Sequence, residues 1–430
     1  MRQTLLLIGL LHIGRRNILP KRGLGIDVFT AAQKRIKWTF DNFERIYLSF
    51  SAGKDSTVML HMVMDEAKKR NRKIGCFFID WECQIGLTIE FAKRMYENYA
   101  EWIEPYWVAL PVKTWNACSQ IEPEWTAWDN AKKELWVRKP ESISITDPTF
   151  FPFYYDGMPF EEFVPAFGDW YAQNKKCACF VGIRADESLN RFRTIARSDK
   201  PMLENKAWTT NAISDVWNVY PIYDWHTEDI WTYFAKYKKP YNKLYDRMYQ
   251  AGLKISQMRI CEPFGDEARK GLWLYQVVEP AMWAKVCLRV AGANTGALYC
   301  NEKGAVLGNH HISLPNGHTY KSFANHLLKT MPPRTSEHYK NKLAVYIKWW
   351  SKRGYEEGIP DSAEIRLESS GKVPSWRKVC KTFLRNDYWC KGLGFSPTKS
   401  SAYQKYVELS KKRRKEWNIF PPETQNDPSI

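Results

Sequence analysis

The stretch IYLSFSAGKDSTVMLHMV, Ile46 to Val63, places a small charged loop between two apolar runs. The first run, Arg45 to Ser51, is rich in β-formers, and the second, Ser56 to Arg70, repeats apolar residues at helical spacing. A glycine-bearing loop that ends at a helix N-terminus lets backbone N–H groups converge on an anion, and the helix dipole favours negative charge there. The pattern therefore predicts an anion-binding loop between a strand and a helix.

The chemistry of this loop suits phosphate. Lys54 supplies a full positive charge, and two serine hydroxyls supply further donors. The Walker A pattern needs a glycine five residues before the Gly-Lys pair and a Ser or Thr directly after the lysine. Leu48 and Asp55 occupy those two places, so the pattern disfavours P-loop NTPase chemistry. The predicted phosphate-binding residues are Ser51, Ala52, Gly53, Lys54, Asp55, Ser56 and Thr57.

Strands and helices alternate through the first half of the chain. The expected strands are Arg45 to Ser51, Lys73 to Asp80, Glu104 to Leu110, Cys177 to Arg184 and Asp215 to Ile222. The expected helices are 27–44, Ser56 to Arg70, Leu87 to Trp102 and His226 to Lys238, the last with Thr227 as its N-cap. This alternation predicts an α/β fold, a parallel twisted sheet with helices on both faces.

The composition is that of a large basic globular protein. The 430 residues are 44% hydrophobic, which is enough for two or three domains with real cores. The net charge is +17, and residues 331–430 carry a marked excess of Lys and Arg that includes the cluster Lys411 to Lys415. This basic, mainly helical region predicts a polyanionic partner such as DNA or RNA, and a solvated basic face without a specific partner is the alternative.

The cysteine spacing and the N-terminal residues bear on the cellular compartment in which we expect the protein. Ten cysteines are scattered without the dense spacing of a disulfide scaffold, which favours a reducing environment, and we expect a cytoplasmic protein. The apolar run Leu5 to Ile13 is followed by Arg15 and Arg16 instead of a small-residue cleavage site, and it is too short to span a bilayer. No membrane partner is expected.

The loop SAGKDS resembles the SGGKDS loop of the PP-loop ATP pyrophosphatase (adenine nucleotide alpha hydrolase-like) superfamily. Ala52 stands where glycine is usual, and we expect it to fit with a negative φ. Three further segments resemble the phosphoadenosine phosphosulfate (PAPS) reductase branch: FVGIRADESLNR (Phe180 to Arg191), VYPIYDWHTEDIWTYF (Val219 to Phe234) and PYNKLYDRMYQAG (Pro240 to Gly252). The alternative for the loop alone is an ordinary βα turn of chance composition.

The resemblance implies an adenine nucleotide, either ATP or the sulfonucleotides PAPS and adenosine phosphosulfate (APS), together with Mg²⁺. It implies catalytic roles for Lys54 and Asp55, and it brings four residues of the second segment toward the anionic groups: Arg184, Glu187, Ser188 and Arg191. Surface ion pairing is the alternative for the arginines. Trp225 and Trp231 are expected in the core, with stacking on a ligand as the alternative.

Asp80 lies at the C-terminal end of the second predicted strand, where open parallel sheets bind ligands. It could hold ribose, adenine or a metal, and Mg²⁺ is expected near Asp55 or Asp80. Capping of the next helix is the equally open alternative.

The sequence departs from PAPS reductases in its cysteines. It lacks the C-terminal Glu-Cys-Gly-(Ile/Leu)-His segment and the CC…CxxC ligands of iron–sulfur members, so we expect neither true PAPS reduction nor a cluster or zinc. Cys261, in RICEPFGDEARKGLWLY (Arg259 to Tyr275), is the candidate thiol nucleophile or ligand, with a plain buried cysteine as the alternative. Cys177 and Cys179 share one face of a strand and could join Cys261 in a metal or redox site.

That segment and the basic tail resemble the DUF3440 group of bacterial and phage proteins, some of which are described as co-activators of gene expression beside a ParB-like protein. The expected organisation is a lead-in at 1–44, a PAPS reductase-like domain at 45–240 with an insertion or lid at 111–170, a helical continuation at 241–330 and the basic region at 331–430. We predict a sulfotransfer or adenylyl-transfer enzyme, with nucleic acid as one candidate acceptor. The alternative is a nucleotide-sensing regulator that binds DNA or protein without turnover.

Overall fold

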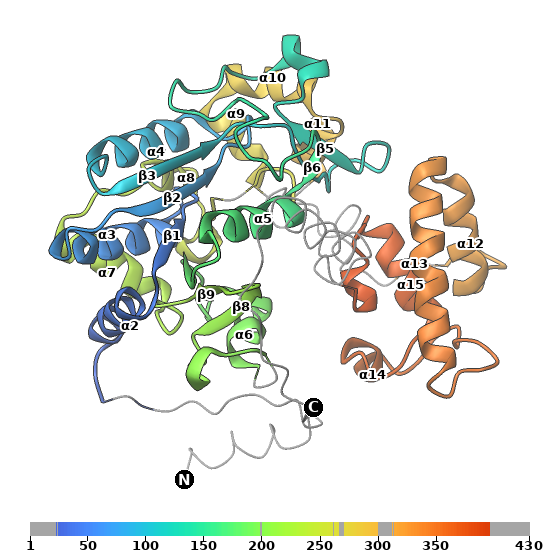
Figure 1. Cartoon of the computed structure of the whole chain (residues 1–430). Helices are drawn as coiled ribbons and strands as arrows, with labels where there is room; N and C mark the ends of the chain where they lie inside the picture. Colours follow the sequence, from blue (N-terminus) through green and yellow to red (C-terminus); the bar gives the residue numbers. More distant parts are fainter. Residues whose placement is uncertain are drawn as a thin grey trace.

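The computed structural model describes residues 23, 25–197, 200–260, 262–265, 271–299, 312 and 314–395 (Figure 1). Cys261, the apolar run at 5–13 and the cluster at 411–415 lie outside these residues. Within the described ranges, every helix is too short or too polar to cross a membrane.

A six-stranded sheet forms the centre of the molecule, in the order β3-β2-β1-β7-β9-β8. Its strands are β1 (Arg45–Ser49), β2 (Ile74–Ile79), β3 (Ile103–Val108), β7 (Cys177–Val181), β8 (Thr209–Ile213) and β9 (Val216–Val219). All neighbouring strands pair in parallel except β8 and β9. The chain leaves β1 toward β2 and β3 and later returns to β1's other side as β7. The C-terminal ends of β1 and β7 are therefore the switch point where sheets of this type bind ligands.

Helices cover both faces of the sheet, as the alternation predicted. One face carries α2 (Val28–Asn42), α3 (Lys54–Lys69), α4 (Gly86–Asn98) and α7 (Thr227–Tyr237), and the other carries α5 (Phe160–Ala172). β1 is buried on both sides, because Tyr47 packs into one core while Ile46 and Leu48 pack into the other. Trp225 lies in the second core and is 2% exposed, and partly buried Trp231 packs against both cores.

The segment 111–170 contains more regular structure than the sequence indicated. A small sheet in the order β5-β4-β6 is formed by β4 (Val112–Trp115), β5 (Glu124–Ala127) and β6 (Met158–Pro159), and η1 (Asn130–Leu135) follows β5. Helix α5 begins near the end of this segment. Its interior contains Pro165 and Gly168, two poor helix formers, which is why the sequence did not indicate a helix there. Gly168 leaves room for the Tyr47 side chain, because a Cβ at residue 168 would lie 2.8 Å from the Tyr47 hydroxyl.

The predicted helix after residue 226 is present, but the predicted N-cap residue, Thr227, is wrong. His226 is the N-cap and Thr227 the first helical residue. The His226 amide donates to Asp229 Oδ2 at 2.7 Å, so an acidic side chain of the first turn accepts from the backbone amide of the N-cap residue.

The remaining helices are α6 (Leu189–Ala196), η2 (Leu203–Asn205), α8 (Leu244–Gln250), η3 (Ile255–Gln257), α9 (Trp273–Val278), α10 (Pro280–Arg289), α11 (Ala293–Tyr299), α12 (Tyr320–Thr330), α13 (Pro333–Ser351), α14 (Ile365–Ser369), α15 (Trp376–Leu384) and η5 (Lys391–Leu393). Residues of α8 to α11 pack into the same core as 111–170, so the core continues past residue 240. Helices α12, α13 and α15 build a separate core, seen beside the main body in Figure 1. The rings of Tyr388 and Trp115 stack at 4.5 Å between the two parts. The domain boundaries at 240 and 330 stay predictions.

His61 on α3 is buried between two other segments. Its Nδ1 lies 2.7 Å from the Tyr99 hydroxyl and its Nε2 2.8 Å from the Pro240 carbonyl. A neutral ring protonated on Nε2 donates to the carbonyl and accepts from the hydroxyl, so both nitrogens are satisfied without charge. Burial lowers the pKa of His61 from 6.5 to about 4.

We expect the free energy of unfolding to fall as the pH drops from about 6.5 to about 4, because unfolded His61 takes up a proton before folded His61 does. A shift of this size corresponds to about 3 kcal/mol across the window. His61→Gln should remove that part of the pH dependence, while His326→Gln, at an exposed position, should keep it. Urea unfolding between pH 4 and 7 measures both, and equal pH slopes in wild type and His61→Gln would contradict the assignment.

Candidate phosphate-binding site

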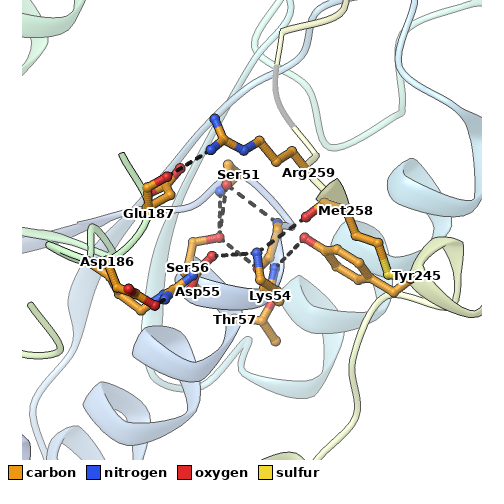
Figure 2. A network of polar contacts seen from close by, with 12 residues as sticks. Ser51, Lys54, Asp55, Ser56, Thr57, Asp186, Glu187, Tyr245, Met258 and Arg259 are labelled. Atoms are coloured by element: carbon orange, nitrogen blue, oxygen red, sulfur yellow. Dashed lines mark hydrogen bonds and ion pairs between the residues drawn. The ribbon is translucent and has the colours of Figure 1, made fainter. Parts of the chain in front are cut away.

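The predicted loop joins β1 to α3, as Figure 2 shows from close by. Ala52 has φ +56°, so the expected negative φ is wrong. This left-handed conformation costs an alanine about 1 kcal/mol, whereas the usual glycine adopts it freely. Ala52 is fully buried, and its carbonyl accepts a hydrogen bond from Asn242 Nδ2 at 3.2 Å. The surrounding contacts thus hold the turn that glycine would make without strain.

Hydroxyl groups tie the loop to the first turn of α3. Ser51 Oγ lies 3.0 Å from Ser56 Oγ. Thr57 Oγ1 donates to the Gly53 carbonyl at 2.8 Å, and the Ser56 hydroxyl donates to the same carbonyl at 3.1 Å. These contacts fix the loop at the positive end of the helix dipole, which is the geometry of an anion site.

A chain of charges connects this loop to the turn after β7. Lys54 Nζ lies 3.1 Å from Asp55 Oδ2, and Asp55 Oδ1 accepts a hydrogen bond from Arg184 Nε. Arg184 is 2% exposed and also lies 3.6 Å from Asp186. Gly182 lets the two segments approach, because a Cβ there would lie 3.0 Å from the backbone of Asp55. The structure therefore brings Lys54, Asp55 and Arg184 together across the switch point.

The other predicted residues of this turn lie next to Arg184. Ser188 is the N-cap of α6, and its Oγ accepts from the Arg191 amide at 3.2 Å. Arg191 is 3.7 Å from Glu187, and its side chain is about half exposed. Ion pairing and capping account for these contacts, and nucleotide binding by Glu187, Ser188 and Arg191 stays a prediction.

Two residues that contact the loop had no predicted role. The Lys54 amide donates to the Tyr245 hydroxyl at 2.9 Å, and Lys54 Nζ donates to the Met258 carbonyl at 3.4 Å (Figure 2). Tyr245 and Asn242 lie in the segment Pro240 to Gly252, for which the sequence indicates a family resemblance and no role at the loop. That motif is the sequence feature that could have identified these residues. The side chains of Tyr245 and Asn242 contact the backbone of the loop.

Asp80, which follows β2, lies in a buried cluster of polar contacts. Its carboxylate accepts from Trp107 Nε1 at 2.9 Å and from the Glu82 amide at 2.9 Å, and it forms an ion pair with Arg138. It does not cap α4, whose first amide, that of Gly86, donates to the Glu279 carboxylate at 3.0 Å. The capping alternative is therefore wrong, and ligand binding at Asp80 stays a prediction that requires displacement of Arg138.

The carboxylates do not fit a Mg²⁺ ion as they are held. Both oxygens of Asp55 lie against cations, and both oxygens of Asp80 accept hydrogen bonds in a buried environment. Among the described residues, no group of three His, Cys, Asp or Glu side chains could hold a metal. Asp55 and Asp80 therefore provide no protein site for Mg²⁺ in this arrangement.

Cys177 and Cys179 point into the same core from β7, as the alternation predicted. Burial raises the pKa of Cys179 to about 12 and that of Cys177 further. Both thiols are therefore protonated at neutral pH and are poor nucleophiles or metal ligands. Cys261 lies outside the described residues.

The parallel sheet, the loop at its switch point and the helical C-terminal region define a PAPS reductase-like α/β protein. The phosphoadenosine phosphosulfate reductase domain matches residues 45–251, and a domain of unknown function, DUF3440, matches residues 252–363 and 355–404. The uncharacterized protein YbdN of Escherichia coli (strain K12) is 46% identical over 400 residues, which cover 92% of this chain and 97% of that protein. The chain therefore belongs to the family of proteins that join these two domains.

More distant proteins match the first half. Adenosine 5'-phosphosulfate reductase of Halalkalibacterium halodurans is 22% identical over 244 residues, which cover 55% of this chain and 84% of that enzyme. The structure of PAPS reductase from Candida auris, in a phosphate complex, aligns with a TM-score of 0.29 and 14% identity over 53% of this chain and 93% of that chain.

The two matched regions are joined by a buried ion pair. Arg289 of α10 donates from Nε and Nη2 to the two oxygens of Glu82, each at 2.8 Å, and both side chains are almost fully buried. Glu82 also accepts from the Trp128 amide at 2.7 Å. The DUF3440 region thus holds the loop after β2 in place.

We expect Arg289→Met to lower the free energy of unfolding by about 3–5 kcal/mol, because it leaves the Glu82 carboxylate buried without its partner. The double variant Glu82→Gln/Arg289→Met should recover part of this loss. Arg334→Met is the control, since it removes an Arg–Glu contact from a side chain that is 74% exposed and should cost less than about 1 kcal/mol. Urea unfolding measures all three, and equal losses in Arg289→Met and Arg334→Met would contradict the role of burial.

Proposed function

We propose that this protein binds an adenine nucleotide, with its phosphate or phosphosulfate group at the loop Ser51 to Thr57. The observation that carries the proposal is the position of the Lys54 side chain and of the N-terminus of α3 at the switch point of a parallel sheet. The match to the PAPS reductase domain and the similarity to APS reductases support an adenine nucleotide as the ligand.

The proposed chemistry is transfer from the bound nucleotide. With ATP, an acceptor would form a bond to the α-phosphorus while the bond to pyrophosphate breaks. With a sulfonucleotide, the acceptor would form a bond to sulfur while the bond between sulfur and the phosphate oxygen breaks, which releases AMP from APS or 3'-phosphorylated AMP from PAPS. Lys54 and Arg184 are the cations placed to offset charge on the leaving group, once the anion competes with Asp55 for them. Attack by a cysteine gains no support from Cys177 or Cys179, because their burial keeps the thiols protonated.

A nucleotide-sensing regulator without turnover is the second candidate. In favour of it, α13 carries the exposed residues Lys340, Lys348 and Trp349, and the exposed Lys352 and Arg353 directly follow the helix. Trp349 is 47% exposed, and the Arg353 guanidinium lies 3.7 Å from the centroid of its ring. Basic residues beside an exposed aromatic ring suit a nucleic acid, through phosphate contacts and base stacking.

We expect Lys54→Ala to weaken nucleotide binding about 10- to 100-fold without unfolding the chain, because it removes a charge-assisted contact to the anion. Lys69→Ala is the matched control, since it removes the same charge from the exposed far end of α3. Isothermal titration with ATP, PAPS and APS measures the affinities. A wild-type protein that binds none of the three overturns the proposal, and so does an unchanged affinity in Lys54→Ala.

For the second candidate, Lys348→Ala and Trp349→Ala should each weaken binding of a single-stranded DNA or RNA oligonucleotide, and Lys348→Ala should also lower the salt dependence. Lys372→Ala removes an exposed lysine outside α13 and is the control. Fluorescence anisotropy across a salt series measures these effects. If the Lys348 and Lys372 variants lose the same affinity, α13 is not the binding surface.

A further inference from the structure

The segment Lys254 to Ile260, which we call the strap, lies against the phosphate loop. It belongs to the region that matches DUF3440 and begins with η3. The Met258 carbonyl accepts from Lys54 Nζ at 3.4 Å, and the Ile260 carbonyl would lie 3.6 Å from a Cβ on Gly53. Residues on both sides of Arg259 therefore touch the loop.

The side chain of Arg259 extends from the strap to the turn after β7. Its Nη2 donates to the Glu187 carbonyl at 2.9 Å, as Figure 2 shows. Arg259 thus bridges the two segments that follow β1 and β7, which are the segments that form the switch point. A guanidinium has five N–H donors, and this bond to a neutral carbonyl uses one of them.

Arg259 differs from the neighbouring cations in its ion pairing. Lys54 and Arg184 share the carboxylate of Asp55, and Arg184 also lies near Asp186. Arg191 lies near Glu187. Among the described residues, Arg259 has no carboxylate partner, so within that part of the chain it is a cation at the switch point that these ion pairs do not include.

We propose that Arg259 is an anion ligand of this site and contacts the phosphate or sulfate beyond the α-phosphate of the bound adenine nucleotide. The inference rests on the proposed function and extends it. The nucleotide site is composite, because the PAPS reductase-like region supplies the loop and the DUF3440 region supplies Arg259. An anion exchanged for the Glu187 carbonyl would gain a charge-assisted and frequently bidentate contact.

A composite site couples nucleotide binding to the strap. An anion held by both the loop and Arg259 would link the strap to α3 through the ligand, whereas the contacts here run through the Met258 and Glu187 carbonyls. Nucleotide binding would then stabilise the DUF3440 region as well as the sheet, since a ligand stabilises the parts of the fold that it contacts.

The experiment is isothermal titration of the full chain with ATP, ADP, AMP and APS. We expect Arg259→Gln to weaken ATP binding about tenfold or more, to affect AMP much less, and to lower the salt dependence of ATP binding. Arg259→Lys should fall between wild type and Arg259→Gln, because it keeps the charge and loses the planar donors. Arg247→Ala, which removes an exposed arginine of α8, should bind ATP like wild type.

The outcomes separate this inference from the proposed function. If wild type binds ATP or APS and Arg259→Gln binds them equally well, the proposed function stands and the role of Arg259 is overturned. An equal loss for ATP and AMP also overturns it, because Arg259 would then not contact the group beyond the α-phosphate. If wild type binds no nucleotide, both proposals fail. Thermal unfolding of each variant shows that the comparison is made on folded protein, and Arg259→Lys decides the question if Arg259→Gln does not fold.

Discussion

The candidate site depends on the ion pairs that the Asp55 carboxylate forms with Lys54 and Arg184. The carboxylate accepts contacts from Lys54 on its own helix and from Arg184 on the turn after β7, and it thereby joins the two segments that meet at the switch point. The arrangement is possible because Gly182 lets the turn approach the backbone of α3 closely. It also neutralises the two cations until an anion competes for them. A nucleotide phosphate would have to compete with Asp55 for these cations. The positive charges of Lys54 and Arg184 therefore stay paired with Asp55 until an anion binds.

The region that matches DUF3440 is part of the architecture around this site. Glu279 caps α4, Arg289 pairs with buried Glu82, and the Tyr275 hydroxyl donates to the Cys83 carbonyl at 2.6 Å. All three contacts hold residues 82–86, the loop that follows β2. The strap adds contacts to the phosphate loop itself. The first matched region therefore supplies the sheet, and the second contacts the loops that follow β1 and β2.

The fold and the loop could be predicted because their signals are local. Apolar periodicity identified β1 and α3, and small and charged residues identified the turn between them. Contacts between distant residues left no such signal: Glu82 and Arg289 are 207 positions apart, and Lys54 and Tyr245 are 191 apart. Local signals also failed where packing overrides propensity. Helix α5 forms despite Pro165 and Gly168, and Ala52 takes a left-handed conformation that its own side chain disfavours.

Nucleotide binding at the loop can be measured by hydrogen–deuterium exchange of the full chain, with and without saturating ATP or APS. We expect nucleotide to slow exchange of the amides in residues 51–57 and in the strap, since the ligand contacts the loop and the segment that lies against it. Two results would contradict a nucleotide site at this loop: slower exchange only in other parts of the sheet, or exchange rates in residues 51–57 and in the strap that do not change when nucleotide is added.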